Sequence, residues 1–238
     1  VFEVFEYKYD VVEIVAQQNY SQENFFAETH EVITDFTKSD RVLKKLEENL
    51  GKQGISQLMM VYFSERKDLE RLILSAVWHS IKHPKQNILQ DFGNEDILEI
   101  SKICRSVSRE RHRMLAFVRF ELLQDEVYFA KIEPDFNVLP LIRKHFKERY
   151  ADQKWMIFDL KRHYGIFYDL KEVHFFTPDS SQLQNFRNSE QFHHEEEKKY
   201  QKLWQRYFVK TGIPERKNMK LHIQWVPKRY WKYLTEKY

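Results

Sequence analysis

Apolar residues change their spacing about halfway along the chain. Before residue 115 they recur every three or four positions, which is the period of an amphipathic helix. This pattern predicts helices over about 2–18, 40–50 and 66–82, and a long helix that Asn94 caps. Beyond it, short aromatic and β-branched runs predict strands at about 117–123, 127–132, 154–159, 166–169 and 173–176, with one helix between them at about 137–150.

These elements predict an α+β fold. A central, mostly antiparallel sheet over about 115–176 would lie between the N-terminal helices and a helical C-terminal section. Residues 177–192 are polar and rich in Ser, Gln and Asn, so we expect a connector there. The chain therefore divides into an α+β body at 1–176, the connector, and a basic aromatic section at 193–238 that packs on the body.

Charge sets residues 198–238 apart from the rest. They hold 12 Lys and Arg against two acids, which leaves 27 basic and 34 acidic residues for residues 1–197. Aromatic residues stand among these cations, namely Trp204, Tyr207, Phe208, Trp225, Tyr230, Trp231 and Tyr233. Clustered positive charge with aromatic rings is typical of a surface that binds a polyanion with stackable bases. The alternative is a solvated basic helix that ordinary aromatic packing holds in place.

The helix expected at about 195–211 separates its rings from its charges. One face holds Tyr200, Leu203, Trp204, Tyr207 and Phe208, and another holds Lys198, Lys202, Arg206 and Lys210. We expect the first face to pack on the body and the basic face to stay in water. A short terminal helix should be anchored by Tyr230, Trp231 and Leu234. The predicted nucleic-acid contacts are Lys202, Arg206, Lys210, Arg216, Lys217, Lys220, Lys228, Arg229 and Lys232.

A second set of polar residues is a candidate for chemistry. His145 and Arg149 fall within the apolar arc of the helix at 137–150, and a buried Arg requires an acid beside it. We expect that acid to be Asp159 or Glu121, in the neighbouring strands. Together with Arg119, these residues would surround one face of the sheet. They form either a structural ion network or a site that holds a phosphate or a base, with His145 or an acid transferring a proton.

Arg113 is a further candidate, because it follows His112 where the long helix gives way to the first strand. Residues next to loops often carry function, but cations near a helix C-terminus also stabilise the helix dipole. Both interpretations of Arg113 stay open.

Several classes of site are excluded or not expected. The chain contains no GxGxxG or GxxxxGK[ST] pattern and no serine-nucleophile motif. Around the adjacent pair His193 and His194 the H-x-x-x-H spacing of zinc helices is absent, so we expect a solvated helix start, with no metal and no cofactor. The single Cys104 excludes an internal disulfide, fits a reducing cytoplasm and should be a core residue. No apolar run approaches the length that spans a membrane.

Several blocks of the sequence resemble a known family. In the middle they are HRMLAFVRF at 112–120, HFKER at 145–149 and WMIFDLKR at 155–162. In the C-terminal section they are LWQRYF at 203–208, ERKN at 215–218 and PKRYWKYLTE at 227–236. This pattern, spread over most of the chain, resembles a bacterial family of proteins assigned to DNA metabolism or repair, with no established activity.

The resemblance implies a context for the chain. Genes of the family commonly accompany a radical-SAM protein assigned to DNA modification or repair, and similar domains occur fused to a uracil-DNA-glycosylase-superfamily domain. Neither association defines a mechanism. The family usually opens with a strand and a D-G-[ST]-F-E-G segment. Residues 1–9 of this chain match the part of the family that comes directly after that segment, so we expect residues to be missing before Val1.

These observations predict a cytoplasmic protein that binds DNA in a bacterial repair or modification system, beside a catalytic partner such as a radical-SAM protein. Two alternatives stay open. The chain could itself be an enzyme that acts on a damaged base or a phosphodiester through His145, Arg149 and Asp159. It could also be a protein–protein adaptor whose basic tail docks on an acidic partner. We expect no association with a membrane.

Overall fold

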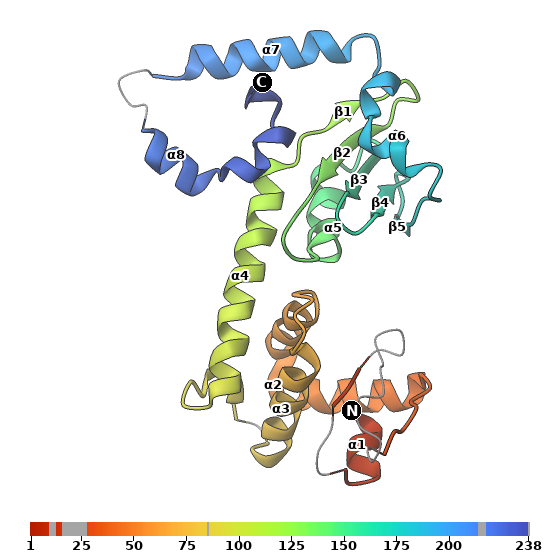
Figure 1. Ribbon diagram of the computed structural model, residues 1–238, viewed down its shortest axis with the longest axis vertical. Coiled ribbons are helices and arrows are strands. Elements are labelled where there is room, and N and C mark those ends of the chain that lie inside the picture. Colours follow the sequence, from red (N-terminus) through yellow and green to blue (C-terminus); the bar gives the residue numbers. More distant parts are fainter. Residues whose placement is uncertain (10–12, 16–27, 85, 214–217, 238) are drawn as a thin grey trace. The chain divides into compact units, whose positions relative to one another are not determined.

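The computed structural model of the chain describes residues 1–9, 13–15, 28–84, 86–213 and 218–237. The chain forms two compact units, Val1–Ser108 and Arg109–Tyr238. A long helix, α4 at Glu95–Phe117, begins in the first unit and ends in the second (Figure 1). As predicted, the Asn94 side chain caps this helix, accepting hydrogen bonds from the amides of Asp96 and Ile97 at 3.0 and 3.2 Å.

The first unit is helical. Its elements are α1 at Phe2–Glu6, α2 at Phe36–Tyr62, α3 at Leu69–Lys82, the 3-10 turn η2 at Ile88–Gln90, and the first half of α4. The apolar side of α3, with Leu72, Ala76 and Val77 buried, packs against α2, and Arg71 and Ser75 of α3 bond to Asp96 of α4. Cys104 is a core residue, as expected, and burial raises the pKa of its thiol to about 11.

Two of the predicted helix boundaries in this unit are wrong. The helix expected over 2–18 ends at Glu6, and residues 13–15 are not helical, while 10–12 and 16–18 lie outside the described residues. The helix expected over 40–50 begins at Phe36 instead, because Asp35 caps it there. Its predicted end at Gly51 is confirmed, because this glycine has a non-helical backbone, with φ of 68° and ψ of 176°, and separates the two helical segments of α2.

The second unit contains the sheet. Its strands are β1 at Glu121–Leu122, β2 at Tyr128–Ile132, β3 at Trp155–Asp159, β4 at Tyr164–Tyr168 and β5 at Val173–Phe176, in the order β1-β2-β3-β4-β5. Neighbouring strands are antiparallel except β2 and β3, which are parallel and joined by helix α5 at Leu139–Arg149. The predicted α+β fold with a mostly antiparallel sheet is confirmed. The first strand is shorter than expected, because α4 extends to Phe117.

The two faces of the sheet are covered by different segments. Trp155 and Ile157 point to the face under α5, where the rings of Phe146 and Trp155 lie 6.0 Å apart. On the other face, Phe186 packs on Phe158, with ring centroids 4.5 Å apart. Phe186 belongs to α6 at Leu183–Arg187, which is followed by the 3-10 turn η3 at Ser189–Phe192. The polar connector expected at 177–192 therefore carries a hydrophobic anchor; the predicted boundaries at 176 and 192 stay predictions.

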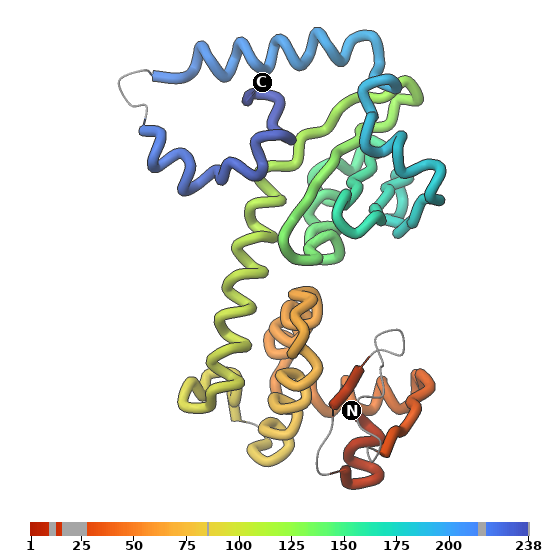
Figure 2. The backbone as a smooth tube through the Cα atoms, viewed as in Figure 1, coloured from red at the N-terminus to blue at the C-terminus, as the bar shows by residue number. Residues whose placement is uncertain are grey.

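The C-terminal section consists of α7 at Glu197–Thr211, α8 at Met219–Trp225, and the 3-10 turns η5 at Lys228–Tyr233 and η6 at Thr235–Lys237. The tube in Figure 2 shows the chain leaving along α7, returning through α8 and ending close to α7. Tyr230 and Leu234 are buried and anchor the terminal turns, as predicted. Trp231 is only half-buried, and its indole N–H donates to the Val226 carbonyl at 2.9 Å.

Candidate nucleic-acid interface

Helix α7 packs with the side that lies between its aromatic and basic faces, through Glu197 and Gln205, and its basic face is exposed as predicted. Tyr200, Leu203 and Tyr207, which were expected to be core residues, are 51%, 50% and 59% exposed. The buried residue is Glu197, whose carboxylate accepts hydrogen bonds from the Leu122 amide at 2.8 Å and from Gln201 at 2.9 Å. The prediction that the aromatic face packs on the body is therefore wrong. The helix is held by hydrogen bonds from its polar side, and much of its apolar surface faces solvent.

Trp204 and Phe208 border this exposed surface. They are 41% and 39% exposed, and each contacts the end of the chain. The Trp204 indole N–H donates to the Glu236 carboxylate at 3.0 Å, and the Lys237 ammonium lies 4.7 Å from the centre of the Phe208 ring. Together with a hydrogen bond from Gln205 to the Thr235 carbonyl, these contacts tie η6 to one edge of α7.

Arg119 is part of the same junction. It donates to Glu236 at 2.7 and 3.2 Å, and its guanidinium lies 6.0 Å from the Trp204 ring. Burial raises the pKa of the Glu236 carboxyl, but the hydrogen bonds from Arg119 and Trp204 outweigh it and leave the pKa below its usual value. Arg119, expected in a sheet-face group with His145, is instead the partner of the C-terminal segment.

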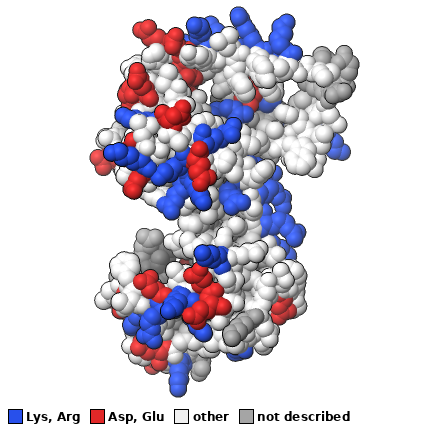
Figure 3. Space-filling model, turned by 180° about the vertical axis from the view of Figure 1, so that it is seen from behind, with Lys and Arg blue, Asp and Glu red and all other residues white. Residues whose placement is uncertain are grey.

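The basic residues of the C-terminal section fall into two sets. Five of the predicted contacts are exposed and form no ion pair with any residue that the structure describes, namely Lys202, Arg206, Lys210, Lys220 and Lys228. Figure 3 shows α7 along the upper edge of the molecule, where acidic atoms gather at the helix start and clusters of basic atoms follow. Two further predicted contacts, Arg216 and Lys217, lie outside the described residues.

The second set is engaged in ion pairs with the body. Arg229 bonds to Glu110 at 2.7 Å and also to Asp135. Lys232 pairs with Glu133, which accepts a second hydrogen bond from the Tyr233 hydroxyl at 2.7 Å. The bonds from Lys232 and Tyr233 hold the pKa of the Glu133 carboxyl below its usual value. The structure thus gives Arg229 and Lys232 a role in fixing the tail.

Glu110 is the centre of this tail attachment. It lies on α4, is 1% exposed, and accepts hydrogen bonds from the Asp135 amide at 3.0 Å and the Tyr230 hydroxyl at 2.6 Å. Arg113, one of the candidates for chemistry, lies 3.7 Å from the same carboxylate. A buried carboxylate is costly without such partners, and here it has an arginine and two further donors. Burial, followed by the bond to Glu110, raises the pKa of the Tyr230 phenol.

Asp159 is buried at the carboxyl end of β3, and its carboxylate, like that of Glu110, accepts several hydrogen bonds. It accepts hydrogen bonds from the amides of Lys161 and Arg162 at 2.9 and 3.2 Å, and from the Arg162 guanidinium at 2.9 Å. Burial raises the pKa of this carboxyl although Arg162 opposes the change. Arg162 also donates to the carbonyls of Pro134 and Asp135. The ion pair of Asp159 and Arg162 therefore links the loop after β2 to the loop after β3.

The predicted group around His145 and Arg149 is not brought together. Both residues are exposed, because the buried arc of α5 is narrower than the apolar pattern suggested and consists of Leu139, Ile142 and Phe146. Within the described part of the chain Arg149 has no acidic partner, and its guanidinium lies 5.7 Å from the Tyr150 ring. The expectation of a buried Arg149 paired with an acid is wrong.

Glu121, the other acid proposed for Arg149, pairs with His193. The imidazole Nε2 lies 3.0 Å from the Glu121 carboxylate, which also accepts from the Ser189 hydroxyl at 3.0 Å. The His193 side chain is only 7% exposed, so the prediction of a solvated histidine pair is wrong for this residue. Its neighbour His194 donates its amide to the Leu122 carbonyl at 2.9 Å, and these bonds fasten the start of the C-terminal section to β1.

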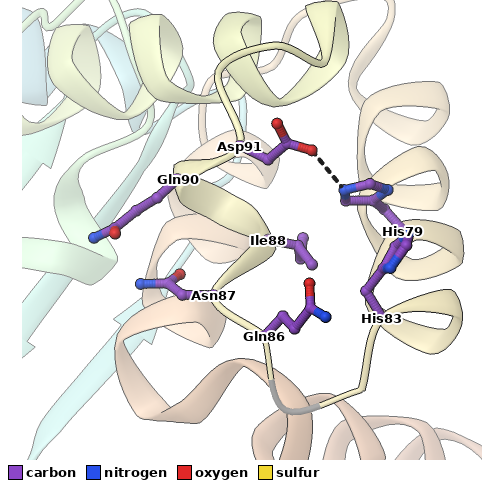
Figure 4. Close-up of a pocket in the computed structure, with 7 residues that line it drawn as sticks. All are labelled: His79, His83, Gln86, Asn87, Ile88, Gln90 and Asp91. Carbon is purple, nitrogen blue, oxygen red and sulfur yellow. Dashed lines mark hydrogen bonds and ion pairs between the residues drawn. The ribbon is translucent and has the colours of Figure 1, made fainter.

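A polar pocket in the first unit was not anticipated from the sequence. It has a volume of about 320 Å³, and Figure 4 shows its lining of His79, His83, Gln86, Asn87, Ile88, Gln90 and Asp91. His79 lies on α3 and His83 directly follows the end of this helix, with ring centroids 4.8 Å apart, and His79 bonds to Asp91 at 3.1 Å. The H-x-x-x-H spacing of these two histidines is the sequence signal that could have pointed to this pocket. Among the described residues, however, no three His, Cys, Asp or Glu side chains converge as metal ligands would.

Comparison with known proteins identifies one match. The domain of unknown function DUF4130 matches residues 65–236, which include residues 65–108 of the helical unit and nearly all of the unit that holds the sheet. No curated protein and no solved structure matches the chain. Each helix within the described residues is too short or too polar to cross a membrane.

Proposed function

Since the chain belongs to the DUF4130 family, whose description assigns no activity, we propose its function from its own surface: it binds DNA through the basic face of α7. The observation that carries this proposal is the exposure of Lys202, Arg206 and Lys210 without acidic partners among the described residues. Arg229 and Lys232 hold the tail to the body, but these three have no such role. A row of uncompensated cations on one helix face is the feature that a polyanion recognises.

The spacing of these residues fits repeated contact with a phosphate backbone. Lys202, Arg206 and Lys210 follow one another every four residues, so successive charges lie about 6 Å apart along the helix axis. Each cation that neutralises a phosphate releases condensed counterions, and this release supplies affinity that does not depend on sequence. The arrangement therefore favours binding along a strand over recognition of particular bases.

The role in a repair or modification system, beside a catalytic partner such as a radical-SAM protein, rests on the resemblance of the sequence blocks. The contacts of the candidate catalytic residues support binding more than catalysis. Asp159 and Glu121 are occupied by Arg162 and His193, and His145 and Arg149 lie exposed on α5. Such pairs stabilise the fold and leave the acids without the open access that proton transfer to a substrate requires.

The test is a salt series of binding measurements on the wild-type chain and on a variant with Lys202→Glu, Arg206→Glu and Lys210→Glu. The wild-type affinity should fall steeply with salt. Removing three phosphate contacts should make the slope of log K against log salt less steep by about 2 to 3 and abolish most binding at moderate salt. Circular dichroism should show that the variant keeps the fold, because the three side chains are exposed.

A matched control reverses three exposed cations of the first unit, Lys44, Lys52 and Arg105, which likewise lack acidic partners among the described residues. This variant has the same net charge as the first but keeps the face of α7. It should retain the wild-type slope. Equal loss in both variants would show that net charge alone drives binding, and a folded α7 variant with unchanged binding would refute the proposal. If the chain captures a partner equally well before and after nuclease treatment, the ligand of this face is an acidic protein and not DNA.

A further inference from the structure

Next to the basic face of α7 lies a stripe of apolar side chains that contact little of the described chain. It consists of Tyr200, Leu203 and Tyr207, each about half exposed to solvent or more. Trp204 and Phe208 on the same helix touch η6, and the Tyr207 ring stacks on Trp204 with ring centroids 5.6 Å apart. Large apolar residues gathered on a polar surface mark an interaction site more often than isolated ones do.

The stripe and the basic residues form one continuous surface. At 100° per residue, Leu203 and Tyr207 lie beside Arg206 and Lys210, and Tyr200 lies one turn closer to the helix start. Seven residues separate the two tyrosines, so their rings are about 10 Å apart along the axis. Whatever binds here must therefore present negative charge and flat apolar groups side by side.

We propose that this stripe is a stacking platform for the unpaired bases of single-stranded DNA, an inference that rests on the proposed function and narrows its substrate. The basic row selects a polyanion, and the rings next to it select one with accessible π-faces. In a duplex each base face is covered by its neighbour along the helix, so a side chain outside the duplex meets only base edges and phosphates. Unpaired bases, by contrast, expose their faces to such rings.

The test compares the affinity of the full chain for a labelled oligothymidylate and for a duplex of equal length. In the variant Tyr200→Ala with Tyr207→Ala, single-strand affinity should fall about 100-fold, since stacking on one ring is worth about tenfold or more. Duplex affinity should stay the same within about twofold, because the phosphate contacts that give non-specific affinity remain. The variant Tyr200→Phe with Tyr207→Phe keeps both rings and should bind single strands like the wild type.

Two controls keep the result specific to the stripe. Tyr62, on α2 in the first unit, is 56% exposed, and Tyr62→Ala should leave binding unchanged. The melting temperature of the Tyr200 and Tyr207 variants should match the wild type, since neither side chain is buried.

The possible failures of the two proposals differ. If the double alanine variant binds single strands as the wild type does, while reversal of Lys202, Arg206 and Lys210 abolishes binding, the platform is refuted and the proposed function stands. An equal loss for duplex and single strand also refutes the platform. If the charge reversal changes neither affinity, the proposed function fails, and the platform fails with it.

Discussion

Glu110 is the residue whose substitution should most weaken the attachment of the C-terminal tail. Its carboxylate is buried, and it accepts hydrogen bonds from Arg229, Tyr230 and the amide of Asp135. Removing one partner of a buried ion pair costs about 3–5 kcal/mol, because the remaining groups lose their compensation. The Arg229 side chain is 42% exposed, so water can take over part of its solvation. We therefore expect Glu110→Ala to cost about 3 kcal/mol, the lower end of that range.

Glu110→Gln separates the charge of this residue from its volume. The amide keeps one acceptor oxygen but loses the charge that faces Arg229, and a hydrogen bond to a charged group contributes about 1.5–3 kcal/mol. The Gln variant should therefore fall between the wild type and the Ala variant. The matched control is Glu148→Gln, on α5, whose side chain is 66% exposed and 3.8 Å from Lys144. It should change stability by less than about 0.5 kcal/mol.

The assay is urea unfolding, combined with amide hydrogen exchange across residues 228–237. Exchange is needed because the two compact units need not unfold together, and a single transition would then not report on the tail. Loss of protection in η5 and η6 should accompany the loss of stability. If Glu110→Gln and the wild type agree within about 0.5 kcal/mol and protect the tail equally, the role assigned to Glu110 is wrong.

Two further predictions concern single ionisable residues. The pKa of Glu236 is lowered in the folded state, so its bonds to Arg119 and Trp204 stabilise the protein above the unfolded pKa of about 4.3 and are lost as pH falls through the folded value. Melting temperatures measured on acidification should therefore fall less steeply for Glu236→Gln than for the wild type, and identical profiles would contradict this. Arg149→Met should leave the free energy of unfolding within about 0.5 kcal/mol of the wild type in urea unfolding, because Arg149 is exposed and has no acidic partner among the described residues. A larger loss would show that it has a structural partner after all.

Periodicity located most elements of the sheet unit and of the helix pair in the first unit. The strand at 173–176 has the predicted bounds, and α3 and α5 differ from the prediction by a few residues. The predicted stop at Gly51 also holds, because this glycine is non-helical and separates two helical segments. An error arose at the start of α2, which lies at Phe36 because Asp35 caps the helix there.

The arrangement of the candidate catalytic residues could not be predicted without the strand pairing. Because β2 and β3 are parallel, α5 must return the chain from the carboxyl end of β2 to the amino end of β3. Its last turn, with His145 and Arg149, therefore lies at the amino end, whereas Asp159 ends β3 a strand length away, about 16 Å. The local spacing of residues along α5 contains no information about this direction.

The aromatic face of α7, unlike its basic face, was assigned incorrectly for a related reason. The hydrophobic pattern shows correctly which residues share a face, but which face packs depends on the partner surface. Here the partner surface offers the amide of Leu122 and the carbonyl of Thr235, and these groups bond to the polar residues Glu197 and Gln205. Hydrogen bonding thus decided the orientation of the helix, which the apolar count could not show.

The basic residues of the C-terminal section have different roles, according to what each of them contacts. Counted along the sequence, Arg229 and Lys232 are equivalent to Lys202 and Arg206, but the first two neutralise buried or half-buried acids of the body. Only cations without such partners can release counterions when a phosphate arrives, so only they contribute to the salt dependence of binding. Substituting Arg229 would weaken DNA binding through loosening of the tail, whereas substituting Arg206 would weaken it directly. The excess of basic residues in this section is therefore an upper bound on its phosphate contacts, because part of that charge holds the fold together.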